Sequence, residues 1–146
     1  MNQTLKALSF ACAALFTTGA IAADTAVPRT PSPPGAKVYF ITPKNGDQVP
    51  TTFVVRFGLE GMGVAPAGVD KEKTGHHHLL IDMDMPADMA MPMGQNVKHF
   101  GGGQTETTVT LEPGKHTLQL LLGDKNHIPH DPPVHSEKIT VEVVAK

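Results

Sequence analysis

The sequence predicts an all-β domain built as a β-sandwich, and three observations support this fold class. Apolar and polar residues alternate in several short stretches, which is the period of a half-buried strand. Turn-forming residues such as Pro113 and Gly114 separate these stretches. No stretch holds a helical period over three turns. Short strands at this spacing favour a sandwich, with a small open barrel as the alternative.

The first three predicted strands follow from side chains of one parity. Val38 and Phe40 share a parity and are followed by a turn-forming stretch at 43–47. Phe53 and Val55 continue the pattern after that turn. A Gly- and Pro-rich stretch then leads to a third apolar run that begins with histidines. The predicted strands are 38–42, 53–59 and 77–83.

The last three predicted strands lie beyond a long irregular stretch. Val109 and Leu111 alternate with polar residues, and so do Leu118 and Leu120 after the next turn. Val141 belongs to a final stretch of the same kind. These strands are predicted at 107–112, 116–122 and 138–144, and the segment 84–104 is expected to hold a seventh strand or an equivalent crossing. The set corresponds to an immunoglobulin-like plan of about seven strands.

The first 22 residues are typical of a secretory signal peptide. Lys6 precedes an apolar run, and Ala20 and Ala22 occupy the small-residue positions of a cleavage site. The apolar run is shorter than the ~20 residues that span a bilayer. We therefore expect cleavage, a periplasmic or secreted protein, and no integral membrane segment after cleavage. Residues 23–36 are rich in proline and predict a flexible or extended spacer before a single domain at 37–146.

Composition argues against several classes of function. Cys12 lies inside the signal peptide, so the mature chain offers no disulfide, thiolate ligand or cysteine nucleophile. A net charge of −2 over 146 residues argues against nucleic acid or an anionic membrane as partner. No G-x-S-x-G nucleophile motif occurs. Catalysis is not favoured, although a histidine-bound metal with an open position could support hydrolysis.

Eight histidines are the most informative feature of the composition. In an immunoglobulin-like plan, the loop before the third predicted strand and the loop before the last strand lie at the same end. This plan brings seven histidines to that end and leaves His116 at the other. His76 and His78 share one face of a strand, whereas His77 points toward the core as a structural residue. The expected metal ligands are His76, His78, His99, His127, His130 and His135.

Imidazole is a common ligand for copper, zinc and nickel, which it binds through a neutral nitrogen. Loop histidines can also act structurally, through hydrogen bonds to the backbone. The histidine pattern therefore predicts a metal site at one end of the sandwich. A metal-free structural or interaction module of the cell envelope is the alternative.

A methionine-rich run at 83–93 suggests which metal would bind. Thioether sulfur is soft and favours Cu(I) over hard ions. Alternating methionines would place several sulfurs on one side of an extended strand, although methionine also fills irregular apolar gaps. Copper is therefore the expected metal and zinc the alternative, with an envelope protein that supplies or receives the ion as the expected partner. The candidate auxiliary ligands are Met83, Met85, Met89, Met91 and Met93.

Three strings resemble a known bacterial family. GHHHLLID at 75–82, HFGGGQTE at 99–106 and LLLGDKNHIPHDPPVHS at 120–136 are similar to the exported family catalogued as domain of unknown function 4399. The resemblance covers 37–144 and implies an envelope location without an established activity. The methionine run is not part of the family pattern. The histidines that the resemblance implies to be shared are His76, His77, His78, His99, His127 and His130.

Overall fold

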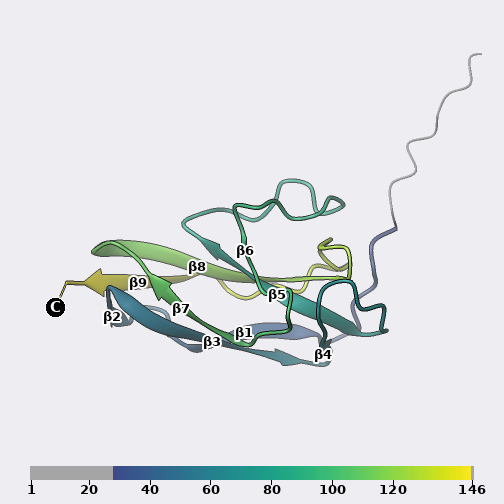
Figure 1. The fold of residues 1–146 in the computed structure, drawn as a ribbon, viewed down its shortest axis with the longest axis horizontal. Helices are drawn as coiled ribbons and strands as arrows, with labels where there is room; N and C mark the ends of the chain where they lie inside the picture. The colour runs from purple at the N-terminus through teal and green to yellow at the C-terminus, as the bar shows by residue number, and fades with distance from the viewer. Residues whose placement is uncertain (1–27, 146) are drawn as a thin grey trace, which may run out of the picture.

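The computed structural model describes residues 28–145, and in that range it is built of strands without a helix (Figure 1). The predicted all-β fold class is therefore confirmed. The signal peptide predicted at 1–22 lies outside the described residues. The strands are β1 (Lys37–Thr42), β2 (Gln48–Pro50), β3 (Thr52–Glu60), β4 (Gly63–Val64), β5 (Thr74–Ile81), β6 (Lys98–His99), β7 (Glu106–Thr110), β8 (Gly114–Gly123) and β9 (Ile139–Val144).

The strands form two sheets that pack as a sandwich. One sheet has the order β1-β3-β7, and the other has the order β2-β9-β8-β5-β4 with β6 paired to β5. The long neighbours are antiparallel, whereas β2 runs parallel to β9 and β4 parallel to β5. This distribution of the six predicted strands over two sheets is that of the immunoglobulin-like plan.

The main core lies between the sheets and is filled by the alternating residues that predicted the strands. Phe57 of β3 and Leu120 and Leu122 of β8 are almost fully buried there. His77 belongs to the same core, because its ring lies 4.6 Å from that of Phe57, centroid to centroid. The expectation that His77 points inward is therefore met. Its neighbours His76 and His78 must then lie on the outer face of the second sheet.

Strand β5 begins and ends earlier than the sequence predicts. It starts at Thr74 rather than at residue 77, so all three consecutive histidines pair with β8 instead of lying at a loop boundary. It ends at Ile81 because Asp82 has a φ of 53°, in the left-handed region that interrupts a strand. The short strands β2, β4 and β6 were not predicted as separate elements.

The segment between β5 and β6 crosses the outer face of the second sheet and is visible above β8 and β5 in Figure 1. It forms no strand between residues 82 and 97, so the predicted extended arrangement of the methionine run is wrong. The expected seventh strand is reduced to the two residues of β6, paired to β5. A second apolar cluster of Leu80, Val97 and Leu121 lies beneath this segment, and Met83, Met85 and Met93 pack against it.

The proline-rich segment before β1 is bound to the domain from Arg29 onward. Thr30 and Ser32 exchange backbone hydrogen bonds with Asp131, with N···O distances of 2.9 Å. The Thr30 hydroxyl also donates to the carboxylate of Asp124 at 2.6 Å. The predicted spacer is therefore extended here and is not a free linker over these residues. Across residues 28–145 there is no helix long and apolar enough to span a bilayer.

Candidate metal centre

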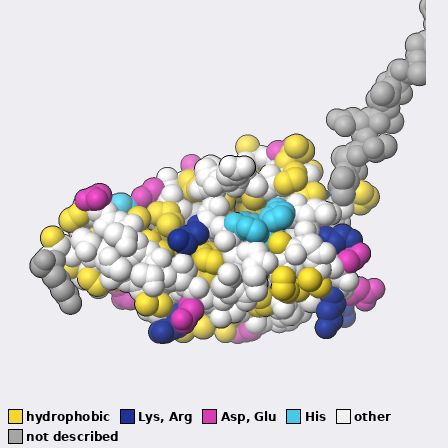
Figure 2. All heavy atoms as spheres, in the orientation of Figure 1, with side chains coloured by type: hydrophobic (Ala, Val, Ile, Leu, Met, Phe, Trp, Pro, Cys, Tyr) yellow, Lys and Arg dark blue, Asp and Glu magenta, His cyan; other side chains and the backbone are white. Residues whose placement is uncertain are grey.

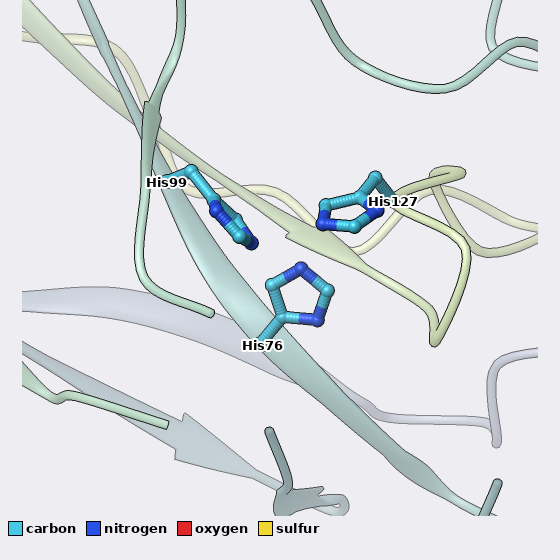
Figure 3. Close-up of side chains that lie close together, drawn as sticks. All are labelled: His76, His99 and His127. Carbon is cyan, nitrogen blue, oxygen red and sulfur yellow. The ribbon is translucent and has the colours of Figure 1, made fainter. Parts of the chain in front are cut away.

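Four histidine rings lie in mutual contact on the outer face of the second sheet. They belong to His76, His78, His99 and His127, and the six distances between their ring centroids range from 4.5 to 6.0 Å. One ring nitrogen each of His76, His99 and His127 lies within 4.8 Å of the other two. Figure 3 shows these three side chains directed toward one another. We call the four residues the histidine cluster.

Three separate segments supply the cluster. His76 and His78 lie two residues apart on β5 and therefore project from the same face. His99 is the register partner of His78 across the β5–β6 pair. His127 comes from the loop after β8, where it has a φ of 66°. The alternation of side chains along β5 thus places His76 and His78, the β5–β6 pairing places His99, and a loop places His127.

The loop that carries His127 is held by Asp124. The backbone N–H groups of Asn126 and Ile128 donate to Asp124 Oδ1 at 2.8 and 3.0 Å. The N–H of His127 donates to the Asp124 carbonyl, and the His127 carbonyl accepts from the N–H of Met93, both at 2.9 Å. The ring of His127 is therefore positioned by its own turn and by the methionine-rich segment.

Two glycines leave room for the cluster. A Cβ at Gly123 would lie 2.7 Å from Cε1 of His78 and 2.8 Å from Cε of Met93. A Cβ at Gly101 would collide with the ring of His99. Neither glycine has a positive φ, so the requirement is for space rather than for backbone conformation.

The buried nitrogens of the cluster lack protein partners. Neither ring nitrogen of His76, nor Nδ1 of His78, has a hydrogen-bond partner among the described residues. Burial, reinforced by the neighbouring imidazoles, lowers the pKa of His76 to about 4 and that of His78 to about 3. The same two causes lower the pKa of His99. These rings are therefore neutral at pH 7, which is the state in which imidazole binds a metal ion.

The cluster is open to solvent on one side. His76 and His78 are buried, His127 is half-buried and His99 is exposed. A pocket of about 380 Å³ leads to the rings of His78, His99 and His127, and Met93 lines it as well. In Figure 2, histidine atoms gather in a patch at the surface of this face. An ion bound here could therefore enter and leave without unfolding of the sandwich.

The remaining histidines lie elsewhere. His130 is buried and its Nε2 donates to the carbonyl of Thr74, the first residue of β5, at 3.2 Å. His135 is exposed and its Nδ1 donates to the Ser136 carbonyl at 3.0 Å. His116 pairs with Asp82, with 2.6 Å between Nδ1 and Oδ2, at the opposite end of β5. Of the seven histidines expected at one end of the sandwich, four meet in the histidine cluster, and the expected ligands His130 and His135 are not among them.

The five methionines named from the sequence also differ in position. Met93 lines the pocket of the histidine cluster. Met83 and Met85 pack on the second apolar cluster, as gap-filling residues do. Met89 is half-buried, and Met91 is 58% exposed. The structure thus brings one methionine to the pocket, which sequence parity alone could not single out.

Residues 55–144 match the family model described as Domain of unknown function (DUF4399). The chain belongs to this family. The match includes all four residues of the histidine cluster and confirms the resemblance found in the sequence. No curated protein matches the chain.

A solved structure of low similarity is the X-ray structure of the endo-beta-1,4-mannanase from Thermotoga petrophila. Its identity to this chain is 18% and its TM-score is 0.46, with 76% of this chain and 20% of that chain covered. This chain therefore spans only a fifth of the length of that enzyme, and the likeness carries no argument about activity.

Proposed function

We propose that this protein binds a copper ion in the histidine cluster and serves copper storage, delivery or tolerance in the periplasm. The observation that carries the proposal is the mutual contact of four imidazole rings whose buried nitrogens have no partner among the described residues. A buried polar group without a hydrogen bond costs about 1–3 kcal/mol. A metal ion would satisfy several such nitrogens at once.

Two features of the cluster favour copper: its imidazole ligands and its access to solvent. Imidazole suits both copper and zinc, but Cu(II) binds a given nitrogen site more tightly than Zn(II). A structural zinc site fills all four coordination positions with protein ligands and holds its ion for folding. Here, His99 is exposed and a pocket reaches the cluster. Ready access supports an ion that is exchanged, as storage or delivery requires. The predicted signal peptide supports a periplasmic location.

The test is a metal titration of the purified, untagged protein with Cu(II), with Cu(I) under reductant and with Zn(II). We expect one tightly bound copper ion in the wild type. His99→Ala and His127→Ala should each weaken binding by at least about tenfold, the scale on which even supporting groups affect metal affinity. His135→Ala is the matched control, because this exposed histidine lies outside the histidine cluster.

Three other outcomes would be informative. Equal metal affinity of all variants would indicate that the metal binds outside the histidine cluster. Tighter binding of Zn(II) than of copper would retain a metal centre and reject copper. No metal in any form of the protein would favour a metal-free structural role for the histidines.

A further inference from the structure

We infer that Met93 is a thioether ligand of the histidine cluster, which makes the site a mixed nitrogen–sulfur centre for Cu(I). The inference rests on the proposed metal-binding function and specifies the form of copper that the site would hold. It separates Met93 from the other methionines of the run by position rather than by composition.

Met93 shares space with the histidine rings. Its methyl carbon and Cε1 of His78 both lie within 2.8 Å of the position that a Cβ would take at Gly123. Met93 lines the same pocket as His78, His99 and His127. The absence of a side chain at Gly123 thus leaves room for both the Met93 methyl group and the His78 ring above β8.

The backbone fixes Met93 beside the cluster. Its N–H donates to the carbonyl of His127 at 2.9 Å, which joins the methionine-rich segment to the loop that carries a candidate ligand. The buried Val97, four residues later, anchors the same segment on Leu80 and Leu121. Met93 is therefore held between a fixed apolar contact and the cluster.

The other methionines of the run do not line the pocket. Met83 and Met85 pack on the second apolar cluster, as Met93 also does, but neither lines the pocket. Met91 is largely exposed. A methionine needed only to cover apolar surface would have no reason to reach the histidine rings, and Met93 does both.

The ligand set suits Cu(I). Thioether sulfur is a soft ligand that favours Cu(I) over zinc, whereas imidazole binds either ion. Neither imidazole nor a thioether carries a negative charge, so the ligand set introduces none that would favour a dication. A thioether does not titrate, so its contribution is independent of pH. Removal of the sulfur should therefore alter the preference among ions and not merely the overall affinity.

The test compares Met93→Leu with Met85→Leu and Met91→Leu, because Met-to-Leu exchange nearly conserves volume and usually preserves the fold. The affinity of each full protein for Cu(I), against a competing Cu(I) chelator, is measured beside its affinity for Zn(II). We expect Met93→Leu to weaken Cu(I) binding by at least roughly tenfold and to leave Zn(II) binding unchanged. Both control variants should match the wild type.

X-ray absorption at the copper edge provides the second measurement. A sulfur scatterer is expected in the Cu(I)-loaded wild type, in Met85→Leu and in Met91→Leu, but not in Met93→Leu. A spectrum with only nitrogen ligands in the wild type, or sulfur retained in Met93→Leu, would overturn the inference while the histidine site stands. Equal losses of Cu(I) and Zn(II) affinity would reduce Met93 to a packing residue and also overturn it. A wild type that binds no metal would reject the proposed function itself.

Discussion

The ring of His99 stacks on that of His78, with centroids 5.1 Å apart and an interplanar angle of 29°. The two residues are register partners across β5 and β6, so backbone pairing sets this contact. The ring of His76, which lies two residues before His78 on β5, has its centroid 4.9 Å from that of His99. Three rings of the histidine cluster are thus fixed by the sheet, and His127 alone depends on a loop.

Gly123 is predicted to be essential for the shape of the site. In Gly123→Ala the new methyl would collide with the ring of His78 and with Met93, and overpacking of this kind costs about 1–3 kcal/mol of unfolding free energy. Copper affinity should fall with it. Urea unfolding and a copper titration measure the two effects. Gly63→Ala is the control, since its nearest contact would be an ordinary 3.4 Å, and equal behaviour of the two variants would contradict the prediction.

His77 is predicted to be dispensable for metal binding. It is fully buried against Phe57, and neither of its ring nitrogens has a hydrogen-bond partner in the described structure. Replacement of an unsatisfied polar group by an apolar one of similar volume removes a desolvation cost of about 1–3 kcal/mol. His77→Leu should therefore be at least as stable as the wild type and should bind copper unchanged. A loss of copper affinity in a folded variant would show that His77 supports the site after all.

The stability of the metal-free protein should fall in mild acid. Burial lowers the pKa of His77 to about 4, and the buried His76 and His78 are lowered to about 4 and about 3. Below pH 6.5 these histidines become protonated in the unfolded chain but stay neutral in the folded protein. Their contribution to the free energy of unfolding is therefore complete above pH 6.5 and declines toward pH 4. His77 alone should contribute on the order of 1–3 kcal/mol, at about 1.4 kcal/mol per pKa unit. Urea midpoints in a chelating buffer at pH 7.5 and pH 5 measure the decline, and His77→Leu should make it shallower.

The ion pair of His116 and Asp82 should give stability the opposite dependence on pH. His116 Nδ1 donates a hydrogen bond to the carboxylate of Asp82, and this bond raises the pKa of His116. The Glu112 carbonyl accepts from the other ring nitrogen at 2.9 Å. The stabilisation is therefore present below pH 6.5 and is lost as the pH rises through the folded pKa of His116. Asp82→Asn should cost about 1 kcal/mol at pH 5.5, because the pair is partly exposed, and less at pH 8.

An NMR titration of His116 should show its pKa return toward the ordinary value in Asp82→Asn. Asp84→Asn is the control, since the carboxylate that pairs with Lys138 is almost fully exposed. A cost of Asp82→Asn that does not depend on pH would mean that the charge of the pair is unimportant.

The sequence was sufficient for the sandwich and for part of the site. Period-two patterns in the sequence identified the six main strands and placed His76 and His78 on one face. In the structure, burial alternates along β3, whereas β5 and β8 are buried at consecutive positions over much of their length. The short strands β2, β4 and β6 have only two or three residues, too few to display a period. The pairing of β6 with β5, which brings in His99, was therefore not predictable from the pattern.

Loop conformation limited the prediction of the other ligands. His127 and His130 were both among the metal ligands expected from the sequence. The structure separates them: His127, which has a positive φ, joins the histidine cluster, and His130 donates to the backbone of Thr74. Composition does not determine such a backbone angle. The same limit applies to the methionine run, whose path over the sheet depends on the apolar cluster beneath it.

The neutrality of His76, His78 and His99 affects the thermodynamics of metal uptake. Most protein ligands must release protons before they bind a metal, so the observed enthalpy includes the ionisation heat of the buffer. These three rings are already deprotonated at pH 7, because burial has lowered their pKa values. They therefore release few protons to the medium when an ion arrives. Their share of the binding enthalpy should depend little on the ionisation heat of the buffer, and the charge that the ion brings to these rings is added to the outer face of the sheet.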